Sequence, residues 1–478
     1  MARRWWTLIA VCTGVFMLLL DITIVNVALP DIQRAFGASL SDLQWTIDAY
    51  ALTLAAFLLT AGSLADLLGR RLLFAIGLSV FTAGSLACGL ANGPLFLVIA
   101  RAGQGVGGAI MFATSLALIA QAFQGRDRAT AFAVLGATTG VAVAIGPVLG
   151  GVLTSGISWR WIFFVNLPVG IAALLVTLRK VEESRNPFAK RPDLPGFVTF
   201  SSGLAALTFG LIRSEPDGWG STTVVASLAA SAALLAAFVV AERVQREPMF
   251  DLRLLRKPAF GGGLLAALAV NGSLFSLLTY LVLYLQQTLG LSAAQTGVRF
   301  LPLTGAIFFA SGVAGRLSER VPARALIAPG FALIGAGLLM MRGLDVSSGW
   351  THLLPGMIVA GVGAGFVNVP LAATAIGVVE PARAGMASGI NTTFRQVGTA
   401  TGVAALGAIF ASHLHAATPA QLRAGAVDGL NEILLIGAAT AFTAALATLL
   451  LVRQRDFVDP AQQHEAPAGR AEPVPTPA

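Results

Sequence analysis

The sequence consists largely of apolar stretches that are long enough to cross a lipid bilayer. The first extends from residue 5 to residue 29, and Asp21 is its only charged residue. A stretch of about 20 apolar residues is typical of a transmembrane helix. Only 11% of the 478 residues are charged and 56% are hydrophobic, whereas soluble proteins contain about 25% charged residues. The sequence therefore excludes a soluble enzyme and predicts an all-α polytopic membrane protein.

Charged residues and turn formers divide the chain into fourteen predicted spans, each near the length that a bilayer requires. The Arg and Lys residues gather at the N-terminus, in the even-numbered loops and in the C-terminal tail, which the positive-inside rule places in the cytoplasm. Both ends of the chain are therefore predicted to be cytoplasmic. The spans are expected near residues 5–29, 45–65, 72–92, 95–118, 130–154, 161–178, 196–213, 222–241, 261–285, 296–315, 324–342, 352–378, 386–411 and 432–452.

Two similar segments indicate an internal repeat. Residues 62–71 follow the second predicted span, and residues 312–320 follow the tenth. Each segment thus follows the second span of a six-span block, and two further spans lie between the blocks. Internal repeats of this kind are typical of transporters, whose substrate site lies near the membrane midplane between the repeats. The predicted units are a six-helix bundle at 1–180, two inserted helices at 181–248, a second six-helix bundle at 249–455 and a disordered cytoplasmic tail at 456–478.

Two charged residues inside predicted spans are the strongest indications of function. A carboxylate such as that of Asp21 is costly in the hydrocarbon unless it is paired, protonated or exposed to a wet cavity. Arg101 of the fourth span lies at a similar predicted depth, stays charged and needs a partner. We expect the two residues to form an ion pair that couples proton movement to a conformational change. The alternative is a static structural pair.

Four other polar residues are candidates for contact with a substrate. Asp48 is predicted near the outer end of the second span, where it either attracts cationic substrates or is simply solvated. Arg395 of the thirteenth span either lines a cavity, neutralises a carboxylate or makes interhelical hydrogen bonds. Tyr280 of the ninth span and Asn26 of the first complete this group, although an aromatic residue in a span more often packs against other helices.

Two glycine-containing segments are predicted to control movement. In the fifth span, proline disturbs the preceding turn and glycines allow close helix contact; the residues are Gly146, Pro147, Gly150 and Gly151. The tight turn after the second span is a candidate cytoplasmic gate, in which an acid pairs with a neighbouring helix end when the gate is closed. The alternative is an ordinary charged turn. The residues of this turn are Gly62, Asp66, Gly69, Arg70 and Arg71.

The sequence indicates no cofactor, metal or nucleic-acid partner. None of the lysines follows a glycine in the pattern of a phosphate-binding loop. The basic residues are scattered between apolar runs rather than clustered on one face. An ion gradient or the substrate gradient must therefore supply the energy for any transport.

Together, these segments resemble the major facilitator superfamily, and specifically its fourteen-span drug:proton antiporters of the EmrB/QacA type. This resemblance implies the major facilitator fold, proton coupling at Asp21 and Arg101, gating at Asp66 and Arg70, and export through the segment that contains Pro147. It also implies that the acid at position 48 favours cationic drugs. The similar segments are 20–30, 62–71, 101–108, 146–151, 159–170 and 391–398.

The expected function is proton-coupled export of lipophilic drugs or antibiotics, cationic ones included, across the bacterial cytoplasmic membrane by alternating access. The expected partners are a small amphipathic substrate, protons and the lipid bilayer, and the protein is expected to act as a monomer. One alternative is an exporter dedicated to a single endogenous metabolite, antibiotic or lipid. A second alternative is a membrane sensor that transports nothing.

Overall fold

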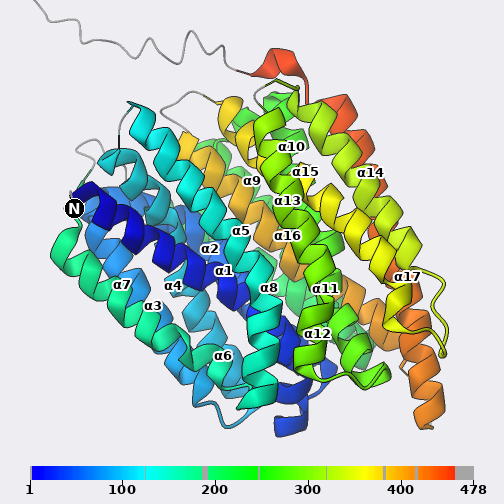
Figure 1. Cartoon of the computed structure of the whole chain (residues 1–478). Helices are drawn as coiled ribbons and strands as arrows, with labels where there is room; N and C mark the ends of the chain where they lie inside the picture. Colours follow the sequence, from blue (N-terminus) through cyan, green and yellow to red (C-terminus); the bar gives the residue numbers. More distant parts are fainter. Residues whose placement is uncertain are drawn as a thin grey trace, which may run out of the picture.

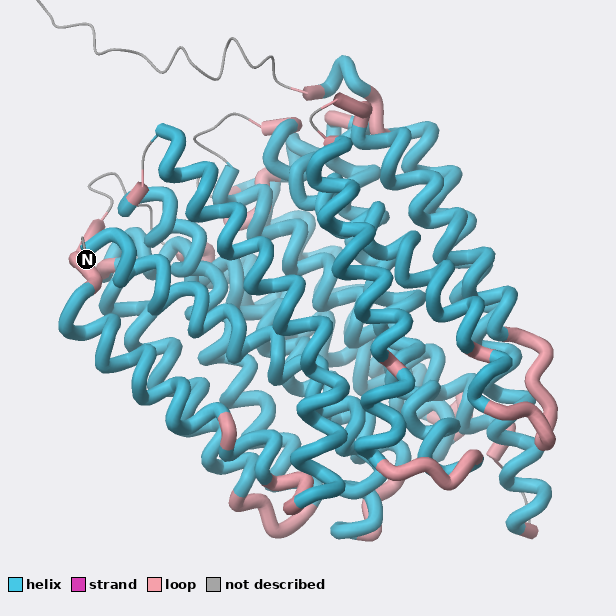
Figure 2. The backbone as a smooth tube through the Cα atoms, in the orientation of Figure 1, coloured by secondary structure: helices cyan, strands magenta, loops and turns pink. Residues whose placement is uncertain are grey.

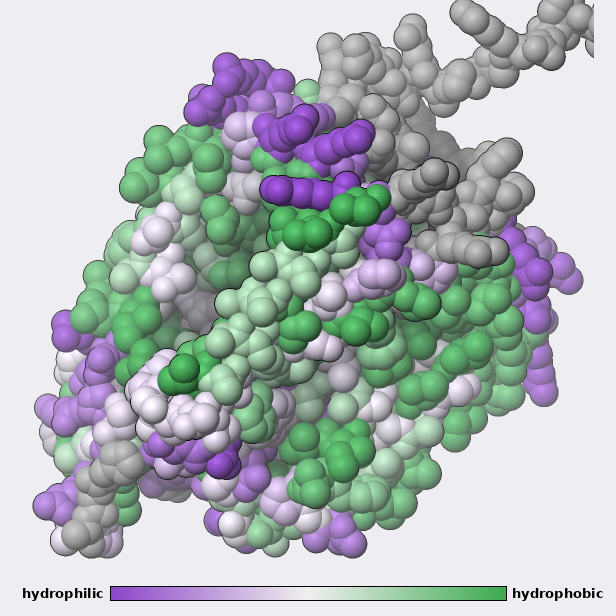
Figure 3. Space-filling model, turned by 180° about the vertical axis from the view of Figure 1, so that it is seen from behind, coloured by the Kyte–Doolittle hydropathy of each residue, from purple (hydrophilic) through white to green (hydrophobic). Residues whose placement is uncertain are grey.

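The computed structural model is built entirely from helices in the residues that it describes, which are 3–123, 125–185, 192–245, 248–318, 320–379, 384–414 and 418–457. The long helices run side by side in a tilted bundle, and short loops connect them at its two ends (Figures 1 and 2). Apolar side chains cover the flanks, whereas hydrophilic side chains gather at the two ends (Figure 3). This distribution fits a protein surrounded by lipid.

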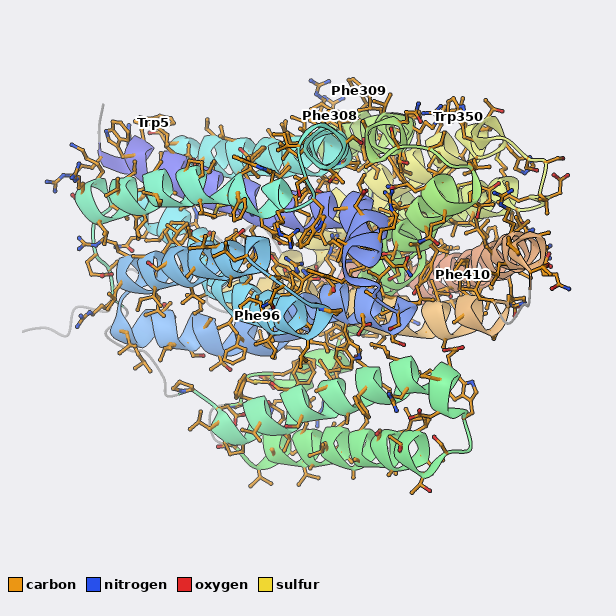
Figure 4. All side chains as sticks on the ribbon, turned by 90° about the horizontal axis from the view of Figure 1, so that it is seen from below. Trp5, Phe96, Phe308, Phe309, Trp350 and Phe410 are labelled. Atoms are coloured by element: carbon orange, nitrogen blue, oxygen red, sulfur yellow. The ribbon has the colours of Figure 1, made fainter. Side chains whose placement is uncertain are left out.

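Seven helices form the N-terminal part of the described chain, and a pair of helices follows them in the sequence. The N-terminal helices are α1 (Arg3–Phe36), α2 (Leu40–Leu68), α3 (Arg70–Gly89), α4 (Pro94–Ala122), α5 (Gly125–Gly156), α6 (Trp161–Phe164) and α7 (Asn166–Lys180). The pair consists of α8 (Leu194–Asp217) and α9 (Thr222–Val244). Viewed from below, this pair forms a layer beside the other helices (Figure 4). Helix α8 contacts both α2 and α16 (Ala384–Ser412).

The C-terminal helices begin with a long span that is interrupted by two π-helical turns. This span consists of α10 (Pro258–Val270), η2 (Asn271–Phe275), α11 (Ser276–Leu283) and η3 (Tyr284–Thr288). After it come α12 (Ala293–Arg299), α13 (Leu301–Leu317), α14 (Ala323–Met341), α15 (Leu354–Gly377), α16 and α17 (Pro419–Leu451). Short 3-10 turns lie at η1 (Leu252–Arg256), η4 (Trp350–His352) and η6 (Gln454–Asp456).

The helices confirm the predicted all-α membrane fold. Thirteen described helical stretches are long and apolar enough to cross a membrane. Helix α16 is also long, with 29 residues, but it carries a polar segment that lowers its hydropathy. The division of the chain at residues 180 and 248 and the cytoplasmic position of its ends stay predictions.

Several helices begin or end outside the predicted boundaries. Helix α1 continues through Pro30 to Phe36, and α17 begins at Pro419, whereas the sequence predicted an end near residue 29 and a start near residue 432. Asp456 caps α10 by accepting a hydrogen bond from the backbone of Ala259 at 3.0 Å, so the described structure includes residues 456 and 457 of the predicted tail. Residues 458–478 of that tail lie outside the described part of the chain.

Candidate functional site

Asp21 on α1 and Arg101 on α4 form an ion pair in the interior of the N-terminal helices. Arg101 Nη1 lies 2.5 Å from Asp21 Oδ2, and both side chains are at most 2% exposed. The other carboxylate oxygen, Oδ1, accepts hydrogen bonds from Gln104 at 2.8 Å and from Asn166 on α7 at 3.2 Å. The predicted contact is therefore present, and three donors satisfy the carboxylate, as a buried charge requires.

Helix α2 holds the arginine from a second side. Arg101 Nε donates to the backbone oxygen of Thr46 at 3.2 Å, and the ring centroid of Tyr50 lies 4.1 Å from the guanidinium carbon. Helix α4 comes this close because Gly105 lies directly against Tyr50 and Thr53, where a side chain would collide. The arginine thus connects α1, α2 and α4. A change in the charge of Asp21 would therefore alter contacts among three helices.

Sequence reasoning missed three residues of this group. Gln104 lies one turn after Arg101, and this i, i+3 spacing could have indicated a contact. Asn166 lies within the segment 159–170, whose resemblance to the family was noted without a role for this residue. Tyr50 gave no signal, because an aromatic residue in an apolar span is common.

A cavity of about 2060 Å³ lies between the N-terminal and C-terminal helices. Apolar side chains of α1 form part of one wall, and α16 supplies a polar wall. The lining continues to Asp66, Arg70 and Arg256, which lie at the helix ends that are predicted to be cytoplasmic. Gly62 also lines the cavity, and no atom lies within 4 Å of where its side chain would be. The cavity therefore opens toward the predicted cytoplasmic end.

At the opposite end, the N-terminal and C-terminal helices are in contact. Gln287 donates to the side chain of Gln33 at 2.6 Å, and the backbone N–H of Ala294 donates to Ser155 Oγ at 2.9 Å. One continuous apolar cluster contains buried residues of both α1 and α11. These contacts close the cavity on this side, so the protein is in a state that is open at one end only.

The Gly–Pro segment of α5 lies at this closed end. Gly146 and Gly150 face α1 so closely that a side chain on either would collide with it. Gly151 packs against the backbone of α12 in the same way, and Gly297 of α12 lies against the carbonyl of Pro147. The segment is therefore a tight contact between the two groups of helices, which small residues make possible.

The predicted gate turn lies at the open end. Asp66 Oδ1 accepts hydrogen bonds from Arg70 at 3.0 and 2.9 Å, so the acid near the end of α2 pairs with the first residue of α3 across the turn. Gly69 has a φ of 124°, a conformation that only glycine adopts easily. The carboxylate of Glu183 accepts hydrogen bonds from the backbone of Arg71 and Leu72 at 3.0 and 3.1 Å and so caps α3. Glu183 was not predicted.

Asp48 and Tyr280 do not line the cavity. Asp48 is fully buried, and neither of its carboxylate oxygens has a hydrogen-bond partner among the described residues. Both expectations for Asp48, attraction of cations in an outward vestibule and simple solvation, placed it near the outer end of the span, whereas α2 begins at Leu40 and places Asp48 more than two turns inside the helix. Tyr280 is also buried; it donates to the backbone oxygen of Val403 at 2.5 Å and accepts from Gln44 at 3.3 Å.

Asn26 and Arg395 do line the cavity. Asn26 Oδ1 accepts a hydrogen bond from Thr279 of α11 at 3.2 Å. Arg395 on α16 donates to the side-chain oxygen of Asn368 at 3.0 Å. In the part of the chain that the structure describes, no carboxylate pairs with Arg395.

Comparison with known proteins identifies relatives along nearly the whole chain. The sequence profile of the Major Facilitator Superfamily matches residues 11–403. The chain is 38% identical to the multidrug resistance protein Stp of Mycobacterium tuberculosis over 430 residues, which cover 90% of this chain and 80% of that protein. It is 36% identical to the puromycin resistance protein pur8 of Streptomyces alboniger over 469 residues, which cover 96% and 93% of the two chains.

Among solved structures, the human organic anion transporter MFSD10 has the same fold. The TM-score is 0.64 at 16% sequence identity, and the match covers 93% of this chain and 99% of that chain. At this identity the likeness concerns the fold alone.

Proposed function

Because the chain belongs to the major facilitator superfamily, we propose that it exports amphipathic drugs or antibiotics in exchange for protons. The protein is a multi-pass membrane transporter of the drug and antibiotic efflux type, and it is not an enzyme. Proton coupling and the roles of individual residues are the proposed part. We also propose that one chain is the functional unit, since a single chain encloses the cavity.

The buried pair of Asp21 and Arg101 is the observation that carries the proposal. In its ionised form, Asp21 accepts hydrogen bonds from Arg101, Gln104 and Asn166. Protonation removes the charge and turns one acceptor into a donor, so the tie between α1 and α4 weakens. Proton entry from outside then favours release of the substrate, and loss of the proton to the inside resets the pair.

The two ends of the cavity supply the alternating access that export requires. At the closed end, Gly151 and Pro147 contact α12, and this contact must separate when the cavity opens outward. At the open end, Asp66 and Arg70 pair with each other across the turn between α2 and α3, and they are proposed to meet a further helix when this end closes. The chain therefore has a contact that can break at one end and a gate that can form at the other.

Measurement of drug efflux tests the coupling. Cells that express the protein should export ethidium or puromycin, and a protonophore should stop the export. Asp21→Asn and Arg101→Ala should abolish this export while the protein remains in the membrane. Asp217→Asn is the matched control, because Asp217 pairs with Arg213 at the surface and its loss should leave export unchanged. Export in the Asp21 variant at the wild-type rate would refute proton coupling at this site.

An exporter dedicated to one compound is the second candidate. The two relatives differ in this respect: pur8 is described as a resistance protein for one drug, puromycin, whereas Stp is described as a multidrug resistance protein. Resistance to one compound and not to an unrelated panel would favour this candidate.

A further inference from the structure

Arg395 is a cation within the cavity for which the described part of the chain supplies no counter-ion. It is the twelfth of the 29 residues of α16, so it lies well away from either end of the helix. Its guanidinium has five N–H donors, and hydrogen bonds to the side chain and backbone of Asn368 use one nitrogen, Nη2. Arginine stays charged inside a membrane protein. A positive charge with free donors therefore faces the cavity.

Asn391 lies one helical turn before Arg395 and lines the same cavity. Residues four apart on a helix share a face. The side chain is 4% exposed, and its Nδ2 has no acceptor among the described residues. A buried amide N–H without an acceptor is costly, so the amide gains a hydrogen bond if it turns toward an acceptor in the cavity. Two kinds of donor on one helix face thus lack a partner.

The carboxylates that line the cavity lie at helix ends, where other groups of the protein pair with them. Asp66 pairs with Arg70 at the end of α2. Asp193, Glu242 and Asp251 accept hydrogen bonds from the backbone of Gly196, Phe250 and Arg253. They lie at the ends of α8 and α9 and at the start of η1. Asp48, which was predicted to attract cations, is buried and is not part of the cavity lining. The deep part of the cavity is therefore positive rather than negative.

The wall formed by α1 has the opposite chemistry. Its lining residues include Val15, Leu18, Leu19 and Ile22. An amphipathic molecule can place its apolar part against these side chains, because the burial of apolar surface is favourable. Its charged group then lies toward α16.

We propose that Arg395 and Asn391 form a subsite for an oxyanion, so that the preferred substrates are amphipathic molecules with a carboxylate, sulfonate or similar group. The proposal rests on the proposed export function and specifies its substrate class. Arginine binds such groups through paired N–H donors in a planar arrangement. Arg395 is a binding residue in this scheme, and Asn368 positions it.

Binding of two matched dyes tests the subsite. Anilinonaphthalene sulfonate and phenylnaphthylamine differ only in the sulfonate group. We would measure their dissociation constants with the full-length protein in nanodiscs of neutral lipid, with empty nanodiscs subtracted. The wild-type protein should bind the sulfonate more tightly than the uncharged dye. Arg395→Gln should weaken sulfonate binding about tenfold or more and leave the uncharged dye within about twofold. Arg395→Lys should retain part of the preference, since the charge remains.

Two further variants separate the subsite from a general charge effect. Arg213→Gln removes a surface arginine and should change neither constant. Arg128 lines the cavity from α5, and an equal loss of sulfonate binding in Arg128→Gln would place the anion elsewhere and overturn the proposal. Equal binding of both dyes to the wild-type protein would overturn it as well. Efflux of the uncharged dye from cells tests export separately, so failure of export and failure of the subsite are distinguishable.

Discussion

The guanidinium carbon of Arg101 lies 4.1 Å from the ring centroid of Tyr50, while Nη1 on the same group binds Asp21. The arginine is thus held between a carboxylate on α1 and an aromatic face on α2. A cation over an aromatic face is stabilised by about 2 kcal/mol when both are shielded from water. The ring therefore keeps the arginine in place when protonation of Asp21 weakens the ion pair.

The ring and not the hydroxyl of Tyr50 should matter. Its Oη is buried and has no partner among the described residues, so Tyr50→Phe should retain efflux and the unfolding temperature. Tyr50→Leu loses the aromatic face and should lower efflux several-fold. Efflux assays and thermal unfolding of the purified protein check both variants. A larger defect in Tyr50→Phe than in Tyr50→Leu would contradict this role of the ring.

A side chain at Gly151 should force the closed end apart. A Cβ at this position collides with the backbone of α12, which cannot give way easily, whereas nothing lies within 4 Å of a Cβ at Gly156 of the same helix. A cysteine introduced at Gln287 reports on this end. Gly151→Ala should speed its labelling by an impermeant maleimide several-fold, and Gly156→Ala should not. Unchanged labelling in both variants would show that this contact does not close the cavity.

Removal of the Glu183 carboxylate should destabilise the gate turn. Glu183→Gln weakens two hydrogen bonds to the start of α3, and loss of a helix cap costs about 1 kcal/mol. Glu182→Gln is the control, because Glu182 forms an exposed pair with Arg3, and such pairs contribute little. Thermal unfolding should separate the two variants. Equal unfolding temperatures would indicate that the cap contributes nothing.

Asp48→Asn should leave export intact. The carboxyl group is buried without a partner among the described residues, and an amide of the same size has no charge to bury. The variant should therefore retain ethidium or puromycin efflux and unfold at the same or a higher temperature. Selective loss of ethidium efflux would restore the role in cation binding that the sequence suggested.

The contact between Asp21 and Arg101 could be predicted because each charge inside an apolar span needs a partner, and few other charged residues lie within the spans. The position of Asp48 could not be predicted from hydropathy, since α2 extends beyond the apolar run. The structure shows why: Ser39 and Asp42 form a capping box that starts the helix at Leu40. A serine followed three residues later by an acid is a sequence signature of a helix start, so this start is predictable from the capping box although not from hydropathy.

Other parts of the site carried no usable signal. Glu183 caps a helix that begins more than a hundred residues earlier in the chain, and nothing local in the sequence predicts such a partner. Asn166 is an uncharged residue beside a short apolar helix, so its hydrogen bond to Asp21 was not foreseen. Uncharged polar residues in spans have many possible partners, and only the packing of the helices selects one.

The position of the pair α8 and α9 has a consequence for movement between the N-terminal and the C-terminal helices. Helix α8 contacts α2 of the N-terminal helices and α16 of the C-terminal helices, and it packs against α9 through Gly203 and Gly210. The pair thus lies across the contact between the N-terminal and the C-terminal helices. Helices α2 and α16 also contact each other directly, so a shift between them would change their own interface as well as the contacts that both make with α8. We therefore expect the pair to shield this part of the contact between α2 and α16 from lipid chains when the two helices move.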